Sequence, residues 1–197
     1  MGRIGTFAIE TVLWFLFWLA VWYVSCNLLM APVYLLVKWA VAALFPSWAD
    51  KVLWIGHDFM LSTTLHLGSV TGRAATLAVK ANFLTYGVGW PLTVALLLAS
   101  DADRIVPKVL LATVILWVPQ SAGVVVEFLH AVYVQSGLLP LGDAMRDLVI
   151  VLFQFLIMVT PALMAVVLWL WLEERFVRSL VVPALTTRSP SDVVDAT

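Results

Sequence analysis

Long runs of apolar residues, separated by short polar stretches, predict several membrane-spanning helices in this chain. The runs lie at about 7–30, 86–100, 109–134 and 148–172. A helix needs about 20 apolar residues to cross a hydrocarbon core of about 30 Å, so the second run is short for a full crossing. We therefore expect a membrane all-α bundle with about four transmembrane helices.

Between the first two runs, the spacing of apolar positions changes from that of a helix to that of a strand. Apolar residues fall on odd positions from Leu53 to Leu67 and again from Ala75 to Phe83, with a turn-forming stretch at 68–73 between them. An open sheet edge is not tolerated in lipid. This pattern therefore predicts an extramembrane β-hairpin over about 52–84.

Pro32 marks the expected end of the first span. Proline lacks an amide hydrogen and disfavours helix at the preceding residue. We expect residues 33–45 to form a kinked or separate interfacial helix, where Lys38 and Trp39 suit the headgroup level. Residues 1–182 would then form a single integral membrane domain, followed by a mobile cytoplasmic tail at 183–197.

Composition supports lipid as the solvent of most of the chain. Hydrophobic residues make up 63% and charged residues 12% of the 197 positions, whereas soluble domains are about half apolar and a quarter charged. The net charge of −1 and the lack of a basic run argue against nucleic-acid binding. A single cysteine, Cys26, excludes an intrachain disulfide and a cysteine-based zinc cluster.

The distribution of lysine and arginine predicts the orientation in the membrane. With four spans, six basic residues share the side of the termini and four share the other side; they are Arg3, Arg104, Lys108, Arg175, Arg178 and Arg188 against Lys51, Arg73, Lys80 and Arg146. Loops rich in lysine and arginine stay in the cytoplasm. Both termini are therefore expected to be cytoplasmic, with the hairpin on the outer side.

Polar residues within the third span form the clearest candidate site. Gln120, Glu127 and His130 follow helical spacing and share one stripe, and Gln154 on the fourth span is placed to face them. Ionisable groups inside a membrane face a bundle interior or a watery cavity. Two interpretations stay open: a proton-handling or peptide-contacting groove, and interhelical hydrogen bonds that fix the packing.

Neither catalysis nor metal binding has support from a motif. Glu127-x-x-His130 is half of a di-iron signature, but its second copy is absent. The chain has no P-loop, G-x-G-x-x-G, G-x-S-x-G or H-E-x-x-H motif. We therefore expect no catalytic residues, no metal and no cofactor.

The predicted hairpin carries a second group of polar residues, which we interpret as a possible partner-docking surface. These residues are His57, Asp58, His66 and Arg73. Adjacent strand residues point to opposite faces, so His57 and Asp58 are not expected to act as an acid–base pair.

Several segments resemble the small membrane proteins that accompany exosortases, in particular exosortase H of Gram-negative bacteria. The resemblance covers nearly the whole chain and rests on Pro32 after an aromatic span, Thr63 with the alternating segment after it, YGVGWPLTVALLLAS at 86–100, PQSAGVVVEF at 119–128 and QFLIMVTPALMAVVLWLW at 154–171. It implies an inner-membrane accessory of a protein-sorting system, with an exosortase-like membrane protein as partner. Cys26 does not lie in the cysteine motif of exosortases themselves. Arg73 and His130 likewise lie in segments that do not match the segments of an exosortase.

The leading hypothesis is a non-catalytic accessory subunit that binds the sorting enzyme or its substrate. The first alternative is a divergent intramembrane cysteine transpeptidase or protease that uses Cys26 and His130. The second is a small transporter or channel subunit, which would need polar residues along the whole membrane depth.

Overall fold

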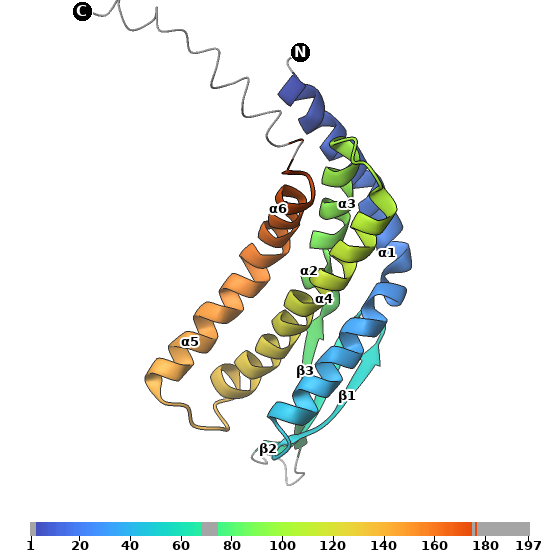
Figure 1. The fold of residues 1–197 in the computed structure, drawn as a ribbon. Helices are drawn as coiled ribbons and strands as arrows, with labels where there is room; N and C mark the ends of the chain where they lie inside the picture. Colours follow the sequence, from blue (N-terminus) through green and yellow to red (C-terminus); the bar gives the residue numbers. More distant parts are fainter. Residues whose placement is uncertain (1–2, 68–74, 175, 177–197) are drawn as a thin grey trace, which may run out of the picture.

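One long N-terminal helix organises the fold. The structure, a computed structural model, describes residues 3–67, 75–174 and 176. Helix α1 (Arg3–Leu44) runs along the length of the molecule, and a small sheet lies beside its C-terminal half (Figure 1). The remaining helices pack beside α1 and beside one another, and they reach from its N-terminal end to the level of the sheet.

The separate interfacial helix expected at 33–45 is wrong, because α1 continues through Pro32 to Leu44. The residues that α1 buries keep helical spacing on both sides of the proline; they are Trp22, Cys26, Met30, Val33, Val37 and Val41. Packing along this uninterrupted stripe stabilises the helix beyond a residue that removes only one of its backbone hydrogen bonds.

The sheet has three antiparallel strands in the order β1-β2-β3, not the two of the predicted hairpin. They are β1 (Ala49–Ile55), β2 (Asp58–Leu67) and β3 (Ala75–Asn82). The sequence pattern missed the tight turn between β1 and β2, where Gly56 has a φ of +64°, a conformation that glycine adopts readily. The turn predicted at 68–73 lies outside the described residues.

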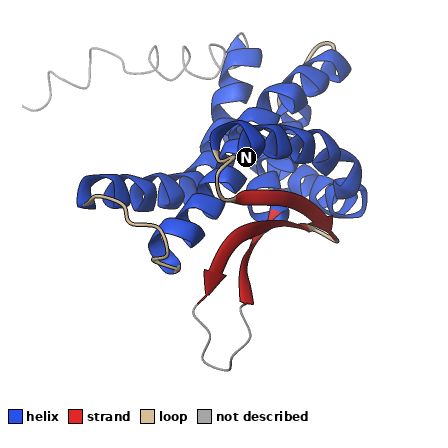
Figure 2. Cartoon of the chain, turned by 90° about the horizontal axis from the view of Figure 1, so that it is seen from below, coloured by secondary structure: helices blue, strands red, loops and turns tan. Residues whose placement is uncertain are grey.

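The extra turn also changes which residues of the first strand are buried. Val52 is buried, whereas Leu53 and Ile55 on the predicted apolar face are exposed. The prediction is confirmed for the other two strands: Phe59 and Leu61 on β2, and Val79 and Ala81 on β3, are buried. Seen from below, the strands form one curved layer against the helices (Figure 2).

In the described part of the chain, five helices and two π-helical segments follow the sheet. Helix α2 (Phe83–Gly87) leads into α3 (Gly89–Ala99). Helix α4 (Ile105–Leu129) continues into η1 (His130–Gln135), and α5 (Asp143–Gln154), η2 (Phe155–Val159) and α6 (Thr160–Leu172) form a second continuous rod. Pro161 lies in the first turn of α6, and its missing amide hydrogen explains the wider π-helical turn before it.

Within the residues that the structure describes, three helices are long and apolar enough to cross a membrane. They span Ile4–Leu44, Ile105–Gln135 and Asp143–Leu172. The predicted second span corresponds to a shorter apolar helix, Phe83–Ala99. Most of its inner residues are buried between α1, α4 and α6. A fourth crossing therefore stays a prediction.

The beginning of α1 and the end of α6 lie at the same end of the molecule, opposite the sheet. The ring of Phe7 stacks on Trp169 at a centroid distance of 5.5 Å. Lys108 of α4 pairs with Glu173, directly after α6. Trp169 Nε1 donates to Ser100 Oγ at 3.2 Å, which joins α6 to the end of α3.

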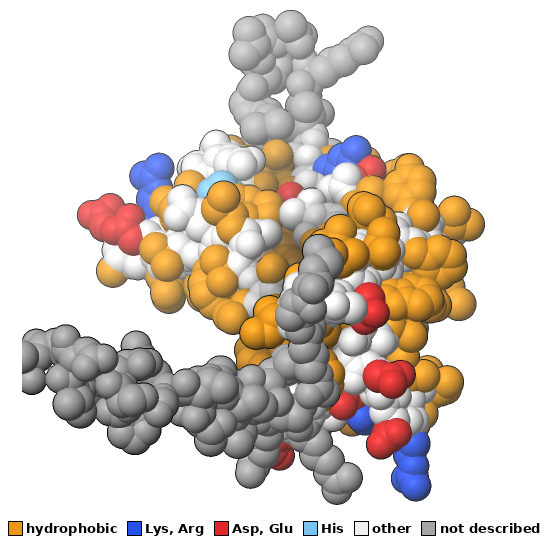
Figure 3. Space-filling model, turned by 90° about the horizontal axis from the view of Figure 1, so that it is seen from above, with side chains coloured by type: hydrophobic (Ala, Val, Ile, Leu, Met, Phe, Trp, Pro, Cys, Tyr) orange, Lys and Arg blue, Asp and Glu red, His pale blue; other side chains and the backbone are white. Residues whose placement is uncertain are grey.

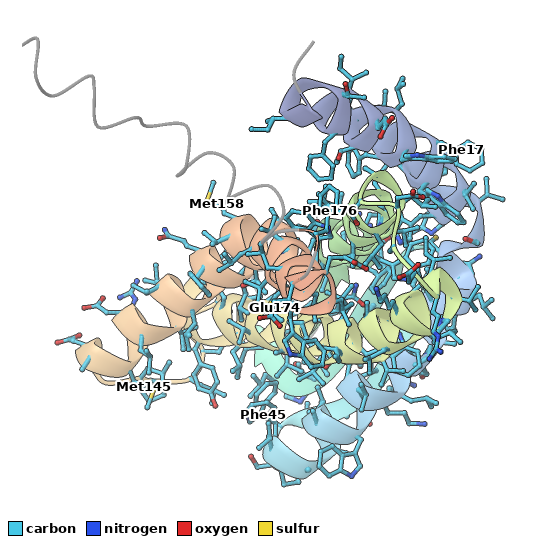
Figure 4. The ribbon with its side chains drawn as sticks, turned by 45° about the horizontal axis from the view of Figure 1, so that its top comes forward. Phe17, Phe45, Met145, Met158, Glu174 and Phe176 are labelled. Atoms are coloured by element: carbon cyan, nitrogen blue, oxygen red, sulfur yellow. The ribbon has the colours of Figure 1, made fainter. Side chains whose placement is uncertain are left out.

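Apolar side chains dominate the outer surface. Figure 3, seen from the end where α1 begins, shows hydrophobic side chains over much of the surface and charged ones in a few separate groups. Phe17 of α1 and Met158 of η2 are 55% and 78% exposed, and both point away from the bundle (Figure 4). Such a surface fits a lipid environment.

Candidate functional site

A groove lies between the sheet and the helices at the end of the molecule that carries the strands. It has a volume of about 380 Å³; the lining residues are Leu77, Ala78, Val79, Lys80, Glu127, His130, Ala131, Gln135, Ser136 and Phe153. Four consecutive residues of β3 form one wall, and the α4–η1 junction with Phe153 of α5 forms the other. Its volume falls within the range of ligand pockets, about 300–1,000 Å³.

Glu127 is the most constrained polar group of the groove. Its Oε2 accepts a hydrogen bond from Tyr86 Oη at 3.0 Å. The Tyr86 ring lies so close to Gly123, one turn earlier on α4, that a Cβ at Gly123 would clash with it. Among the described residues, no lysine or arginine forms an ion pair with Glu127. Its half-buried carboxylate therefore has a hydrogen-bond donor but no compensating charge.

His130 lies one turn beyond Glu127 and is held by a ring contact. Its imidazole stacks on Phe153 with a centroid distance of 4.2 Å and an interplanar angle of 3°. Gln135 Nε2 lies 3.4 Å from His130 Nδ1. These contacts join η1 to α5 and fix the far wall of the groove.

The strand wall carries an ion pair. Lys80 Nζ lies 2.8 Å from Asp58 Oδ2 on the neighbouring strand. The other carboxylate oxygen of Asp58 is buried and has no hydrogen-bond partner in the described part of the chain. With Glu127, this region holds two carboxylates and one lysine, so it favours an additional cation.

The structure separates the residues predicted to share one polar stripe. Glu127 and His130 line the groove, whereas Gln120 is buried two turns away beside Tyr86 and Thr160. Gln154 is exposed and does not line the groove. The predicted pairing of Gln154 with this stripe is therefore not found.

Of the residues predicted as a docking surface on the hairpin, the structure describes three. His57 points to α1 and Asp58 to Lys80, in agreement with the expected opposite directions. His66 is exposed and pairs with Thr76 across the sheet, and Arg73 lies outside the described residues. The three described positions make different contacts, and a docking surface on the hairpin stays a prediction.

Cys26 has a histidine neighbour, but not the predicted one. Its Sγ lies 3.1 Å from Nδ1 of His57, in the turn before β2, whereas His130 lines the groove, to which Cys26 does not contribute. The thiol is fully buried between α1 and the sheet. The sequence pattern did not reveal this pair, because its members are 31 positions apart and in different elements.

Lys80, which lines the groove, and Tyr86, which donates to Glu127, were absent from the predicted site. In the sequence, Lys80 counted only as a basic residue of the outer side, and Tyr86 only as the start of an apolar run. Lys80 precedes the end of β3 and Tyr86 lies in the helix that follows directly. The carboxylate of Glu127 within a predicted span indicated that a polar partner lies nearby, but it did not identify that partner as Tyr86. In residues 3–67, 75–174 and 176, no three His, Cys, Asp or Glu side chains form a metal-binding group.

Comparisons with known proteins assign the family. Residues 1–176 match the model of a family described as exosortase H-associated membrane protein. Neither a search of curated proteins nor a search of solved structures finds a match. Because the matched region includes every element described above, the chain belongs to the family of exosortase H-associated membrane proteins.

Proposed function

We propose that this chain is a non-catalytic accessory subunit of an exosortase-type protein-sorting system in the bacterial inner membrane. Its role would be to bind the sorting enzyme or the substrate of that enzyme. Family membership supports an association with exosortase H. The shape and surface of α1 support a role in binding.

The length of α1 is the observation that carries this proposal. Its 42 residues extend about 60 Å at about 1.5 Å per residue, roughly twice the thickness of the hydrocarbon core. The C-terminal half is fastened to the sheet, because Tyr34 Oη donates to the carbonyl of Val52 at 3.0 Å. This half would project beyond the bilayer.

The projecting half of α1 still has an apolar outer face. Leu35 is 63% exposed and Trp39 is 72% exposed. Contiguous apolar surface outside lipid is typical of a protein–protein interface. We infer that this face packs against a membrane-protein partner of the sorting system.

The arrangement in the membrane follows from the two ends of the molecule. The beginning of α1, the loop after α3 and the end of α6 share one end. We propose that this end is cytoplasmic and that Phe83–Ala99 completes a set of four crossings. The sheet and the groove would then lie on the outer side, where a sorting enzyme meets secreted proteins.

Copurification with exosortase H from native membranes tests the association directly. Leu35→Ser and Leu13→Ser form a matched pair, because both leucines lie on α1 and are 63% and 62% exposed. We expect Leu35→Ser to reduce copurification about tenfold, since burying a leucine contributes about 1.5–3 kcal/mol. Leu13→Ser should leave it unchanged. A wild-type chain that does not copurify, or normal sorting in a deletion strain, would contradict the proposed function.

A catalytic role is the second candidate, and one observation favours it. The Cys26 Sγ and His57 Nδ1 atoms are close enough for a nucleophile–base pair. The full burial of Cys26 opposes this role, because a nucleophile must reach its substrate. We interpret the pair as a structural contact between α1 and the turn before β2.

Substitution of the thiol separates the two candidates. Cys26→Ala should leave protein sorting at the wild-type level if the chain is an accessory subunit, and a thiol-reactive probe should fail to label the folded protein. Loss of sorting with normal protein levels in the membrane would favour the catalytic candidate. Ser25→Ala, one position earlier on α1, serves as the control for local packing.

A further inference from the structure

Strand β3 ends the sheet, and its outer edge forms one wall of the polar groove. The sheet order is β1-β2-β3, and the groove is lined by Leu77 to Lys80. Outside the β2–β3 ladder, none of the described residues forms a hydrogen bond with the backbone of Ala78 or Lys80. An open strand edge of this kind is a template for another extended chain.

The register of β2 and β3 identifies which backbone groups face the groove. The amide of Phe83 donates to the carbonyl of His57, and the paired positions continue without a shift as far as Ser62 and Ala78. Hydrogen-bonded pairs alternate with non-hydrogen-bonded pairs in an antiparallel ladder. Val79 and Ala81 therefore bond to β2, whereas the N–H and C=O groups of Ala78 and Lys80 point outward.

The opposite wall provides a charge that a partner can complement. Glu127 accepts only the Tyr86 hydroxyl in the structure and has no ion-pair partner in the described ranges. Lys80 is already paired with Asp58. A buried or half-buried carboxylate is costly unless a cation or further donors reach it. A lysine or arginine side chain in the groove would supply both.

We propose that this groove binds an extended segment of exosortase H that carries a lysine or arginine. Its backbone pairs with Ala78 and Lys80 on the free edge of β3, as in other complexes formed by strand addition, and its cationic side chain reaches Glu127. This inference rests on the proposed function, since it takes exosortase H as the partner, and it adds the site and the mode of binding.

Proline substitution at the strand edge tests the pairing. Ala78→Pro removes one outward N–H, and the sheet tolerates it because that N–H does not bond to β2. Asp50→Pro is the matched control, since Asp50 is an exposed residue at the irregular start of the opposite edge strand, β1. We expect Ala78→Pro to reduce copurification of exosortase H at least tenfold and Asp50→Pro to leave it unchanged. Thermal unfolding in detergent checks that both variants fold.

Two further experiments test binding in the groove without a proline substitution: the variant Glu127→Gln and photocrosslinking. Glu127→Gln keeps hydrogen bonding to Tyr86 but removes the charge, so copurification should weaken and lose part of its salt dependence. A photocrosslinking residue at Gln135, in the groove wall, should form an adduct with an extramembrane segment of exosortase H near a lysine or arginine. The same residue at Ala144, exposed on α5 and outside the groove, should not.

The outcomes separate this inference from the proposed function. If the wild-type chain copurifies with exosortase H but Ala78→Pro and Glu127→Gln copurify equally well, the groove is not the binding site, while the accessory role stands. An adduct from Gln135 to a second copy of this chain, or to a transmembrane helix of exosortase H, would also overturn it. If the wild-type chain does not copurify at all, both proposals fail.

Discussion

The sheet region and the helix region of this protein are packed in different ways. Around the sheet, one large cluster of buried side chains joins α1, all three strands and the end of α4, and it includes Phe59, Phe83 and Phe128. Around α3, two small clusters centre on Leu97 and Leu116. In this second region, close contact depends on small residues such as Gly89 and Ala95.

The difference reflects the two solvents proposed for the two regions. In water, removing apolar surface from solvent drives packing, so a large common core forms. In lipid, this driving force between helices is absent, and association depends on close van der Waals contact and hydrogen bonds. Trp90 Nε1 donating to Thr113 Oγ1 at 2.7 Å is such a bond between α3 and α4. α1 takes part in both kinds of packing.

Two fully buried leucines test the difference between the two regions most directly. Leu61 lies in the sheet core and Leu97 in the helix region, and both are 0% exposed. Leu61→Ala should lower the free energy of unfolding by about 2–5 kcal/mol, as cavities in water-soluble cores do. Leu97→Ala should cost about half as much, because only packing is lost. Equilibrium unfolding in mixed micelles measures both free energies. Equal losses in the two variants would contradict a difference in packing between the two regions.

Close packing of helices in the second region predicts a strong effect at Gly89. A Cβ there would clash with the backbone carbonyl oxygen of Pro161 on α6, which cannot move as a side chain can. Gly89→Ala should therefore destabilise the protein by about 2–3 kcal/mol. Gly142→Ala is the control, because nothing lies within 4 Å of a Cβ at that position. A thermal unfolding midpoint for Gly89→Ala equal to that of the control would contradict the packing of α3 on α6.

The ion pairs of the two regions predict a smaller difference. Glu173 is nearly buried beside Lys108, whereas the side chain of Lys80 is 63% exposed beside Asp58. Lys108→Met should cost about 1–2 kcal/mol, because it leaves a buried carboxylate without its partner. Lys80→Met should change the free energy of unfolding by about 0–1 kcal/mol. Unfolding at low and high salt checks both values. A larger loss of free energy for Lys80→Met than for Lys108→Met would contradict this order of the two ion pairs.

Local patterns in the sequence predicted which helices and strands form better than they predicted where each one begins and ends. The apolar runs coincide with helices, and the odd positions of β2 and β3 form the buried face. The separate helix after Pro32 was predicted wrongly, because packing against the sheet outweighs the local preference of proline. The turn at Gly56 was missed because the apolar alternation continues across it, although the chain reverses there.

The candidate site was predicted only in part, for a related reason. Helical spacing placed Glu127 and His130 on one stripe, and the groove contains both. It could not identify Tyr86, which is 41 positions from Glu127. It also could not show that the backbone of β3 forms the opposite wall, since strand order is a property of the assembled sheet.

The sequence alone thus determined the apolar character and length of the helices and the alternating faces of two strands, because both follow from periodicity within one element. Only the tertiary structure decided that α1 is continuous, that Cys26 meets His57, and that β3 has a free edge beside Glu127. These features join residues far apart along the chain. They depend on how whole elements pack, and no local preference encodes that packing.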